Sequence, residues 1–209
     1  MKVNEIFLSI QGEGASTGYP TVFVRFTGCN LRCSYCDTKY SYDDGFDMTP
    51  EDVYGKINEY GYKRICITGG EPLLQEEINM LLSLLKEYEV NIETNGSIDI
   101  KAFKLSDRHR FTMDMKAPSS LESKEMKLSN FKHLRETDEI KFVIGSREDY
   151  EWAKETIKNY YEKGVITFSS VFTKIDPKEI IGWILDDKLD VRFQLQIHKF
   201  IWNPEEKGV

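Results

Sequence analysis

Three cysteines lie close together near the start of the chain, in the segment Gly-Cys-Asn-Leu-Arg-Cys-Ser-Tyr-Cys-Asp. Cys29, Cys33 and Cys36 have the spacing C-x3-C-x2-C, and no fourth cysteine follows nearby. Three thiolates at this spacing are suited to bind three irons of a cubane iron–sulfur cluster, which leaves the fourth iron without a protein ligand. An open iron is a place for chemistry, whereas a fully ligated cluster usually only carries electrons. The spacing therefore predicts a catalytic cluster.

A structural zinc site is the alternative interpretation of the same cysteines, with Cys66 or a histidine as fourth ligand. Zinc sites commonly use two C-x2-C units, whereas this chain has one C-x2-C and one C-x3-C. Cys66 lies in an apolar segment, where a lone cysteine is typically a small buried hydrophobic residue. The crowding of three cysteines argues against a disulfide framework and favours metal ligation in a reducing compartment, so we expect a cytoplasmic protein.

Two kinds of sequence pattern alternate along the chain and define the elements that must position these residues. Short segments rich in β-branched and aromatic residues predict strands, and segments with capping residues or apolar helical periodicity predict helices. The expected strands span residues 21–26, 64–68, 90–94, 111–115, 139–144, 165–169 and 191–197, and the expected helices span residues 50–60, 76–88, 147–163 and 177–187.

This alternation predicts a single α/β domain over residues 1–209, because helices that connect successive strands place those strands parallel. The strands are too few for a closed eight-fold barrel, so we expect a partial (β/α)6-type barrel of mostly parallel strands. Active sites in such folds lie at the carboxyl ends of the strands. Four segments end or follow expected strands and so predict one composite site: the cysteine loop, Gly69-Gly70-Glu71, Glu93-Thr94-Asn95-Gly96 and Asp114-Met115-Lys116.

The composition argues against several classes of function. The 209 residues carry a formal net charge of −7 without a basic stripe, which disfavours binding to nucleic acid. The chain has no apolar run of the ~18 residues that a membrane-spanning helix needs. Its first residues also do not resemble a secretory signal. We therefore expect a protein that binds neither nucleic acid nor a membrane.

The cysteine motif, with Gly69-Gly70-Glu71 in the next loop, resembles the radical S-adenosylmethionine superfamily. The resemblance implies a 4Fe–4S cluster on Cys29, Cys33 and Cys36, with S-adenosylmethionine bound at the open iron and cleaved to an adenosyl radical. It also implies cofactor contacts from the loops of the composite site, namely Tyr35, Cys36, Asp37, Gly70, Glu71, Glu93, Asn95, Asp114, Met115 and Lys116.

A second resemblance is to the 7-carboxy-7-deazaguanine synthase family, and it extends from Asn4 to the tail near Pro204. The most specific segments are Gln11-Gly12-Glu13-Gly14 and Cys36-Asp37-Thr38. The family resemblance implies a lyase that contracts the ring of 6-carboxy-5,6,7,8-tetrahydropterin to 7-carboxy-7-deazaguanine. Ammonia is lost, on the route to queuosine and other 7-deazapurines.

The same resemblance implies roles for residues that are not part of the cysteine loop. The expected substrate contacts are Ile10, Gln11, Gly12, Glu13, Arg25 and Thr68. Gln11 and Glu13 are suited to the alternating donors and acceptors of a pterin edge, and Arg25 to the carboxylate of the substrate. Alternatively, Arg25 pairs with an acid on a neighbouring strand. Thr38 is expected to bind a magnesium ion (Mg²⁺), and the partners are expected to be a second copy of the chain and a reductant such as flavodoxin.

A rival function is activation of a glycyl-radical enzyme. Such activating enzymes use the same kind of cysteine loop but need neither the Gln-Gly-Glu-Gly segment nor Asp37-Thr38.

Among the histidines, His109 and His133 lie in polar segments and are expected at the surface, and His198 is either structural or close to substrate. The tail, from His198 to the last residue, either closes over the site or frays.

Overall fold

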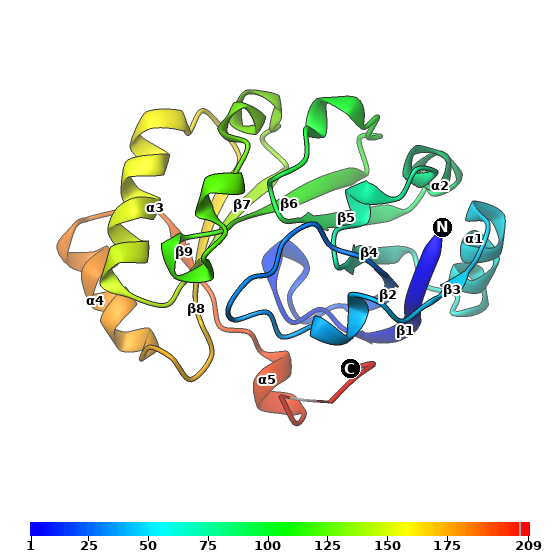
Figure 1. Ribbon diagram of the computed structural model, residues 1–209, viewed down its shortest axis with the longest axis horizontal. Coiled ribbons are helices and arrows are strands. Elements are labelled where there is room, and N and C mark those ends of the chain that lie inside the picture. Colours follow the sequence, from blue (N-terminus) through cyan, green and yellow to red (C-terminus); the bar gives the residue numbers. More distant parts are fainter. Residues whose placement is uncertain (205) are drawn as a thin grey trace.

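The fold is built around one nine-stranded sheet whose strand order is β3-β1-β2-β4-β5-β6-β7-β8-β9. The computed structural model describes residues 1–204 and 206–209 (Figure 1). The strands are β1 (Lys2–Ile10), β2 (Pro20–Phe26), β3 (Phe46–Asp47), β4 (Arg64–Gly69), β5 (Glu89–Thr94), β6 (His109–Met115), β7 (Glu139–Ile144), β8 (Val165–Ser170) and β9 (Arg192–Phe193). The α-helices are α1 (Pro50–Glu59), α2 (Ile78–Leu84), α3 (Arg147–Tyr160), α4 (Pro177–Asp186) and α5 (His198–Ile201).

Neighbouring strands from β2 to β9 are parallel, which confirms the predicted α/β architecture and the open, partial barrel. Strand β1 was not predicted; it pairs antiparallel with β2 and pairs with the short strand β3 on its other edge. The predicted last strand was too long, because only Arg192 and Phe193 pair with β8. Short 3-10 helices, rather than an α-helix, connect β5 to β6 and β6 to β7.

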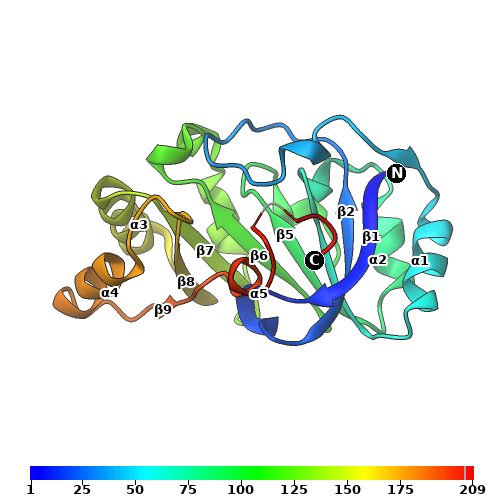
Figure 2. The ribbon, with the colours of Figure 1, turned by 90° about the horizontal axis from the view of Figure 1, so that it is seen from below.

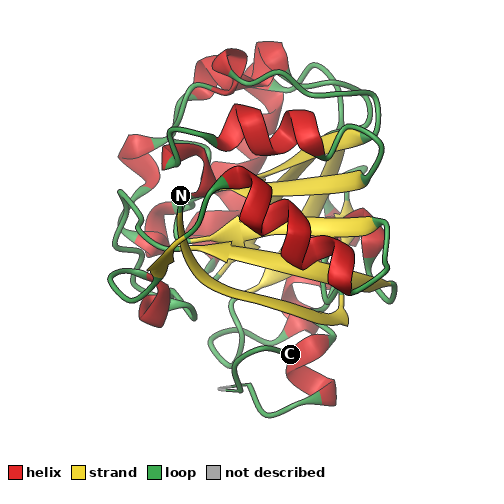
Figure 3. Ribbon diagram, turned by 90° about the vertical axis from the view of Figure 1, so that its right-hand side faces the viewer, coloured by secondary structure: helices red, strands yellow, loops and turns green. Residues whose placement is uncertain are grey.

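The parallel strands place apolar and polar side chains on opposite faces, because successive residues of a strand point to opposite sides. One face carries buried apolar residues such as Ile67, Ile92, Met113 and Phe142, which form the core. Helices α1 to α4 cover the outside of the curved sheet (Figures 2 and 3). The opposite face carries polar residues, and it bounds the cavity described below.

Capping residues begin α1, α3 and α4 where the sequence predicts, whereas α2 has no side-chain cap and is shorter than the predicted 76–88. Thr49 and Asp52 form a capping box at the start of α1, in which the Thr49 hydroxyl accepts from the Asp52 amide at 3.1 Å. Ser146 accepts from the Asp149 amide at the start of α3, and Asp176 accepts from the Lys178 amide at the start of α4. In the described part of the chain, no helix is long and apolar enough to cross a membrane.

Candidate active site

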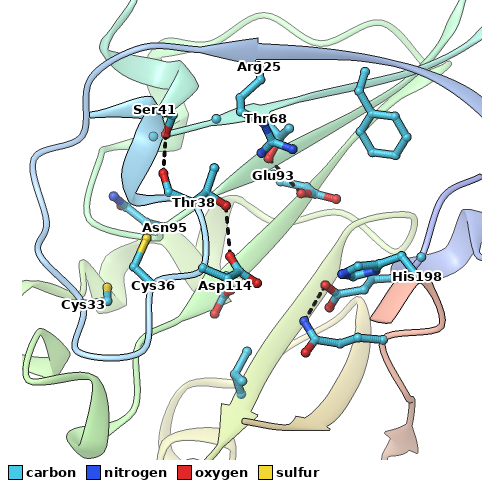
Figure 4. Close-up of a pocket in the computed structure, with 18 of the residues that line it drawn as sticks. Arg25, Cys33, Cys36, Thr38, Ser41, Thr68, Glu93, Asn95, Asp114 and His198 are labelled. Carbon is cyan, nitrogen blue, oxygen red and sulfur yellow. Dashed lines mark hydrogen bonds between the residues drawn. The ribbon is translucent and has the colours of Figure 1, made fainter. Parts of the chain in front are cut away.

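A cavity of about 360 Å³ opens at the carboxyl ends of the parallel strands. The loops after β2, β4, β5 and β6 all contribute to its lining, together with the β1–β2 loop and the C-terminal segment. Figure 4 shows Cys33, Cys36 and Asn95 on one side of this cavity, His198 on the other, and Arg25, Thr68 and Glu93 between them. The structure thus brings together the segments that the sequence placed at strand ends.

The three cysteines of the loop after β2 line one end of the cavity and are each partly exposed. The Cys29 sulfur accepts hydrogen bonds from the Leu31 amide at 3.4 Å and from the Asn95 side chain at 3.8 Å. Burial raises the pKa of the Cys33 thiol to about 11, and nearby Lys116 opposes this shift. Cluster assembly on these sulfurs therefore has to displace protons, as metal binding to thiols generally does.

Gly70 provides a direct test of whether the residues present fit a bound cofactor. A Cβ atom built on Gly70 would lie 2.0 Å from the Gly28 carbonyl oxygen and 3.0 Å from the Cys29 Cβ. The β4 loop therefore runs against the base of the cysteine loop, and only a glycine permits this approach. Cys29, Cys33 and Cys36 all line the cavity beside this contact. Their thiols are the donor type that an iron–sulfur cluster requires, although in the described residues the three sulfurs are not gathered into a metal-binding group.

Two residues of the predicted cofactor set do not line the cavity. Glu71 is fully buried, and its carboxylate accepts from the Leu73 amide, the Thr94 hydroxyl and the Asn95 amide. Burial raises its pKa to about 7 although these donors oppose the shift. Met115 is fully buried on the apolar face, since it alternates with Asp114 and Lys116 along β6. Glu71 thus connects the loop after β4 to the end of β5 without lining the cavity. Met115 belongs to the hydrophobic core.

Cys66 lies within β4 and is fully buried, as the sequence predicts. Burial raises the pKa of its thiol well above the usual value, and the adjacent Glu93 carboxylate adds to this effect. We expect a Cys66→Ser variant to retain the full iron and sulfide content of the wild-type protein after anaerobic reconstitution. Colorimetric iron and sulfide analysis measures this, and loss of iron in the variant would make Cys66 a cluster ligand.

Four ion pairs lie around the cavity; three of them join different segments, and the Lys116–Asp114 pair is local to the end of β6. Lys116 contacts Asp114 at 3.0 Å, Lys199 contacts Asp37 at 2.8 Å and Arg25 contacts Glu5 at 2.7 Å, while Lys141 forms the fourth pair with Glu13. The Arg25 pair is the alternative that the sequence left open, and the same side chain also lines the cavity.

Glu93 is held by neutral groups instead. It accepts from the Gln11 amide at 3.2 Å and from the Thr68 hydroxyl at 2.9 Å. These contacts place Glu93 beside two residues of the predicted substrate set, whereas the sequence assigned it to the cofactor. Ile10 and Gly12 of the same set also line the cavity.

Thr38 and Asp37 lie at the edge of the cavity next to the cysteines. The Thr38 hydroxyl donates to Asp37 at 2.9 Å, and Asp37 also binds Lys199. Although burial opposes the effect, the Lys199 ammonium lowers the pKa of Asp37 far below its usual value. No group of three or more His, Cys, Asp and Glu residues able to hold a metal ion occurs within residues 1–204 and 206–209. Mg²⁺ fits such a place only if water supplies most of its ligands, which is its common mode of binding.

Several cavity residues come from parts of the sequence that carried no motif. Lys141 lies in the middle of β7, and Gln196, His198 and Lys199 lie in the C-terminal segment. A charged residue flanked by the apolar residues Ile140 and Phe142 was the available signal for Lys141. Pro204, Glu206, Lys207 and Val209 also line the cavity, so the described tail folds over it, whereas Glu205 lies outside the described residues.

The histidines differ in part from expectation. His133 is exposed as predicted, but His109 is buried, because β6 begins at His109 rather than at Phe111. Its Nε2 lies 3.0 Å from the Leu85 carbonyl oxygen, and burial lowers its pKa. His198 lines the cavity, where a Cβ on Gly12 would overlap its ring.

Comparison with known proteins identifies the family. Residues 23–184 match the model of the Radical SAM superfamily. The 7-carboxy-7-deazaguanine synthase of Clostridium acetobutylicum is 45% identical over 218 residues, covering 100% of this chain and 99% of the relative. That of Koribacter versatilis is 39% identical over 228 residues, covering 100% of both chains. The crystal structure of QueE from Escherichia coli matches with a TM-score of 0.77 at 23% identity, covering 93% of this chain and 92% of that one. The chain therefore belongs to the radical SAM superfamily and, within it, to the 7-carboxy-7-deazaguanine synthase family.

Proposed function

We propose that this chain catalyses the ring contraction of 6-carboxy-5,6,7,8-tetrahydropterin to 7-carboxy-7-deazaguanine, with loss of ammonia, as a lyase of 7-deazapurine and queuosine biosynthesis. The observation that carries the proposal is the composition of the cavity. One end presents Cys29, Cys33 and Cys36, and the other presents the β1–β2 loop with Gln11 and Glu13. A cofactor at the cysteines and a flat polar substrate at that loop would lie next to each other.

The β1–β2 loop is held so that it can bind a heterocycle edge-on. Its Gly14 amide donates to the Gln194 side chain at 2.6 Å, and its Ala15 amide donates to the buried Glu139 carboxylate at 3.2 Å. The Gln11 amide oxygen accepts from the Glu13 amide at 3.2 Å. These contacts fix a short stretch of backbone amides, a side-chain amide and a carboxylate, which match the alternating donors and acceptors of a pterin.

Arg25 is placed to bind the substrate carboxylate. Its Nε is occupied by Glu5, and its guanidinium lies 5.8 Å from the Phe7 ring centroid and 5.7 Å from that of Tyr40. Aromatic neighbours and the Glu5 pair orient the guanidinium while its terminal nitrogens remain able to form a two-pronged contact. The Phe7 and Phe23 rings stack with their centroids 5.0 Å apart and give this side of the cavity an apolar wall.

When bound, the cluster and S-adenosylmethionine supply the radical that starts the reaction, and the residues of the chain bind and orient around them. Cys29, Cys33 and Cys36 would hold the cluster. Tyr35, Asn95, Asp114 and Lys116 line the cavity next to them and are suited to the adenosyl and methionine groups.

The test of this function is conversion of the pterin by anaerobically reconstituted, reduced protein with S-adenosylmethionine. We expect mass spectrometry to detect 7-carboxy-7-deazaguanine with one equivalent of ammonia. Cleavage of S-adenosylmethionine without this product, combined with radical formation on a protein partner, would favour the glycyl-radical activase instead.

The reaction would take place in the cytoplasm of a cell that supplies a reductant such as flavodoxin, and the working form would be a homodimer.

We expect the Thr38→Ala variant to lose most of the stimulation of turnover by Mg²⁺ while it still cleaves S-adenosylmethionine. The reason is that the hydroxyl would be one of few protein ligands of the ion, and the ion would neutralise charge on the substrate. Product formation measured over a Mg²⁺ titration, with the wild-type protein in parallel, checks this. An unchanged titration curve would remove Thr38 from the ion-binding site.

A further inference from the structure

Lys141 is a buried cation in the middle of strand β7. It is in register with Asp114 of β6 and Thr167 of β8, and its side chain is 13% exposed. Its ammonium contacts the Glu13 carboxylate, which is 17% exposed and also accepts from the Gln196 amide at 2.8 Å. The Glu13 carboxylate thus has two partners, Lys141 from the sheet and Gln196 from the C-terminal segment.

The other acidic side chains around the cavity each contact a different donor, although several of them lie near enough to Lys141 to act on its charge. Asp114 already has Lys116, Asp37 has Lys199, and Glu5 has Arg25. Glu93 is held by two neutral donors. Lys141 is therefore the cation that serves Glu13.

The electrostatics show what this contact does. Burial alone raises the pKa of Glu13, but the attraction and hydrogen bond of Lys141 outweigh burial, so that the pKa is lowered. Burial lowers the pKa of Lys141, but Glu13, Asp114 and Glu93 more than reverse this. His198 also faces Glu13, and its own pKa is lowered by burial, so it is mostly neutral near pH 7 and cannot replace Lys141. Both members of the pair stay charged at neutral pH.

A buried ion pair is weak evidence for stability, because apolar side chains of similar size are often as stable. This pair instead faces a binding cavity. A carboxylate offers about four lone-pair positions, and Lys141 and Gln196 engage one on each oxygen. Both oxygens can accept N–H groups from a ligand only while Glu13 is ionised, because protonation turns one of the two oxygens into a donor.

We propose that Lys141 is a positioning residue, which keeps Glu13 ionised and oriented so that its carboxylate accepts the N–H donors of the substrate's aminopyrimidinone edge. The inference rests on the proposed function, because it assigns Lys141 to recognition of the pterin. In this proposal Glu13 contacts the substrate, and Lys141 contacts only Glu13.

The test compares Lys141→Met with the wild-type protein. We expect the KM for the pterin to rise about 10- to 100-fold, as for a lost charge-assisted hydrogen bond, while cleavage of S-adenosylmethionine without pterin is unchanged. Without its cation, the pKa of Glu13 should rise, because the Lys141 contact is the main effect that outweighs burial. As the pH is lowered, the kcat/KM of the variant should therefore begin to fall at a higher pH than that of the wild-type protein. A structural role alone would lower the melting temperature but leave KM and the pH profile unchanged.

Two further variants separate the alternatives. In a Glu13→Gln background, adding Lys141→Met should change KM less than about 3-fold, because the two residues act as a unit. Lys154→Met removes a lysine that pairs with Glu151 and Asp187 away from the cavity, and it should leave KM unchanged. If Lys141→Met does not fold, Lys141→Arg replaces it: we expect a raised KM with a pH profile like that of the wild-type protein, because the charge is kept and the position is altered.

The outcomes distinguish the two proposals. A wild-type protein that leaves the pterin unchanged overturns the proposed function and this inference with it. Wild-type turnover with an unchanged KM and pH profile in Lys141→Met, or an unchanged KM in Lys141→Arg, overturns the inference alone. Fully additive effects of the Glu13 and Lys141 substitutions also overturn it.

Discussion

A Cys33→Ala protein is expected to bind no intact 4Fe–4S cluster and to show no cleavage of S-adenosylmethionine. The loop provides three sulfurs at the end of the cavity, and Cys66 cannot replace a lost ligand because it is fully buried inside β4. Iron and sulfide analysis and a chromatographic assay for 5′-deoxyadenosine measure the two effects.

The Cys66→Ser protein is the matched control, since it removes one thiol and leaves the loop intact. It should behave like the wild-type protein in both assays. Cofactor cleavage by Cys33→Ala at a rate near that of the control would show that the loop ligands are assigned wrongly.

Replacing Arg25 by methionine should lower kcat/KM for the pterin by at least about 100-fold, because a charge-assisted two-pronged contact is lost. The loss should appear mainly in KM, since Arg25 would bind a group of the substrate that does not react. Glu5 would also lose its cation, although the Tyr40 hydroxyl would still donate to it at 2.9 Å. Steady-state kinetics over a range of pterin concentrations measure the effect.

Arg64→Met is the control for this change. Arg64 also pairs with a glutamate of the same sheet, Glu89 at 2.7 Å, but it does not line the cavity. Its kcat/KM should match that of the wild-type protein. If Arg25→Met lowers kcat/KM no more than Arg64→Met does, Arg25 does not bind the substrate carboxylate.

Local signals allowed most of the parallel sheet to be predicted from the sequence. The capping residues Thr49, Ser146 and Asp176 correctly located three helix starts, because each acts within a few residues of itself. Strand β1 was missed because it pairs antiparallel with β2 and so lies outside the alternation of strands and helices on which the prediction rested. The segment after β9 was predicted as strand, but Gln194 and Gln196 bind the β1–β2 loop through their side chains instead.

The site residues that were predicted correctly are those in the loops directly after the parallel strands. Met115 was assigned to it only by its position between Asp114 and Lys116, and the two-residue period of a strand turns it to the core instead. Glu71 was included with its two glycines, yet its carboxylate serves the backbone of neighbouring loops. Lys141, Gln196 and Lys199 were missed, because their partners Glu13 and Asp37 are more than 100 residues away along the chain.

The central claim is that three cysteines hold a cluster whose fourth iron is open to a ligand. Electron paramagnetic resonance of the reconstituted, reduced protein tests it most directly, with spectra recorded before and after addition of S-adenosylmethionine. We expect about four irons and four sulfides per chain and a clear change of the spectrum on addition. Protein that takes up no iron, or a cluster whose spectrum is the same with and without S-adenosylmethionine, would contradict the claim.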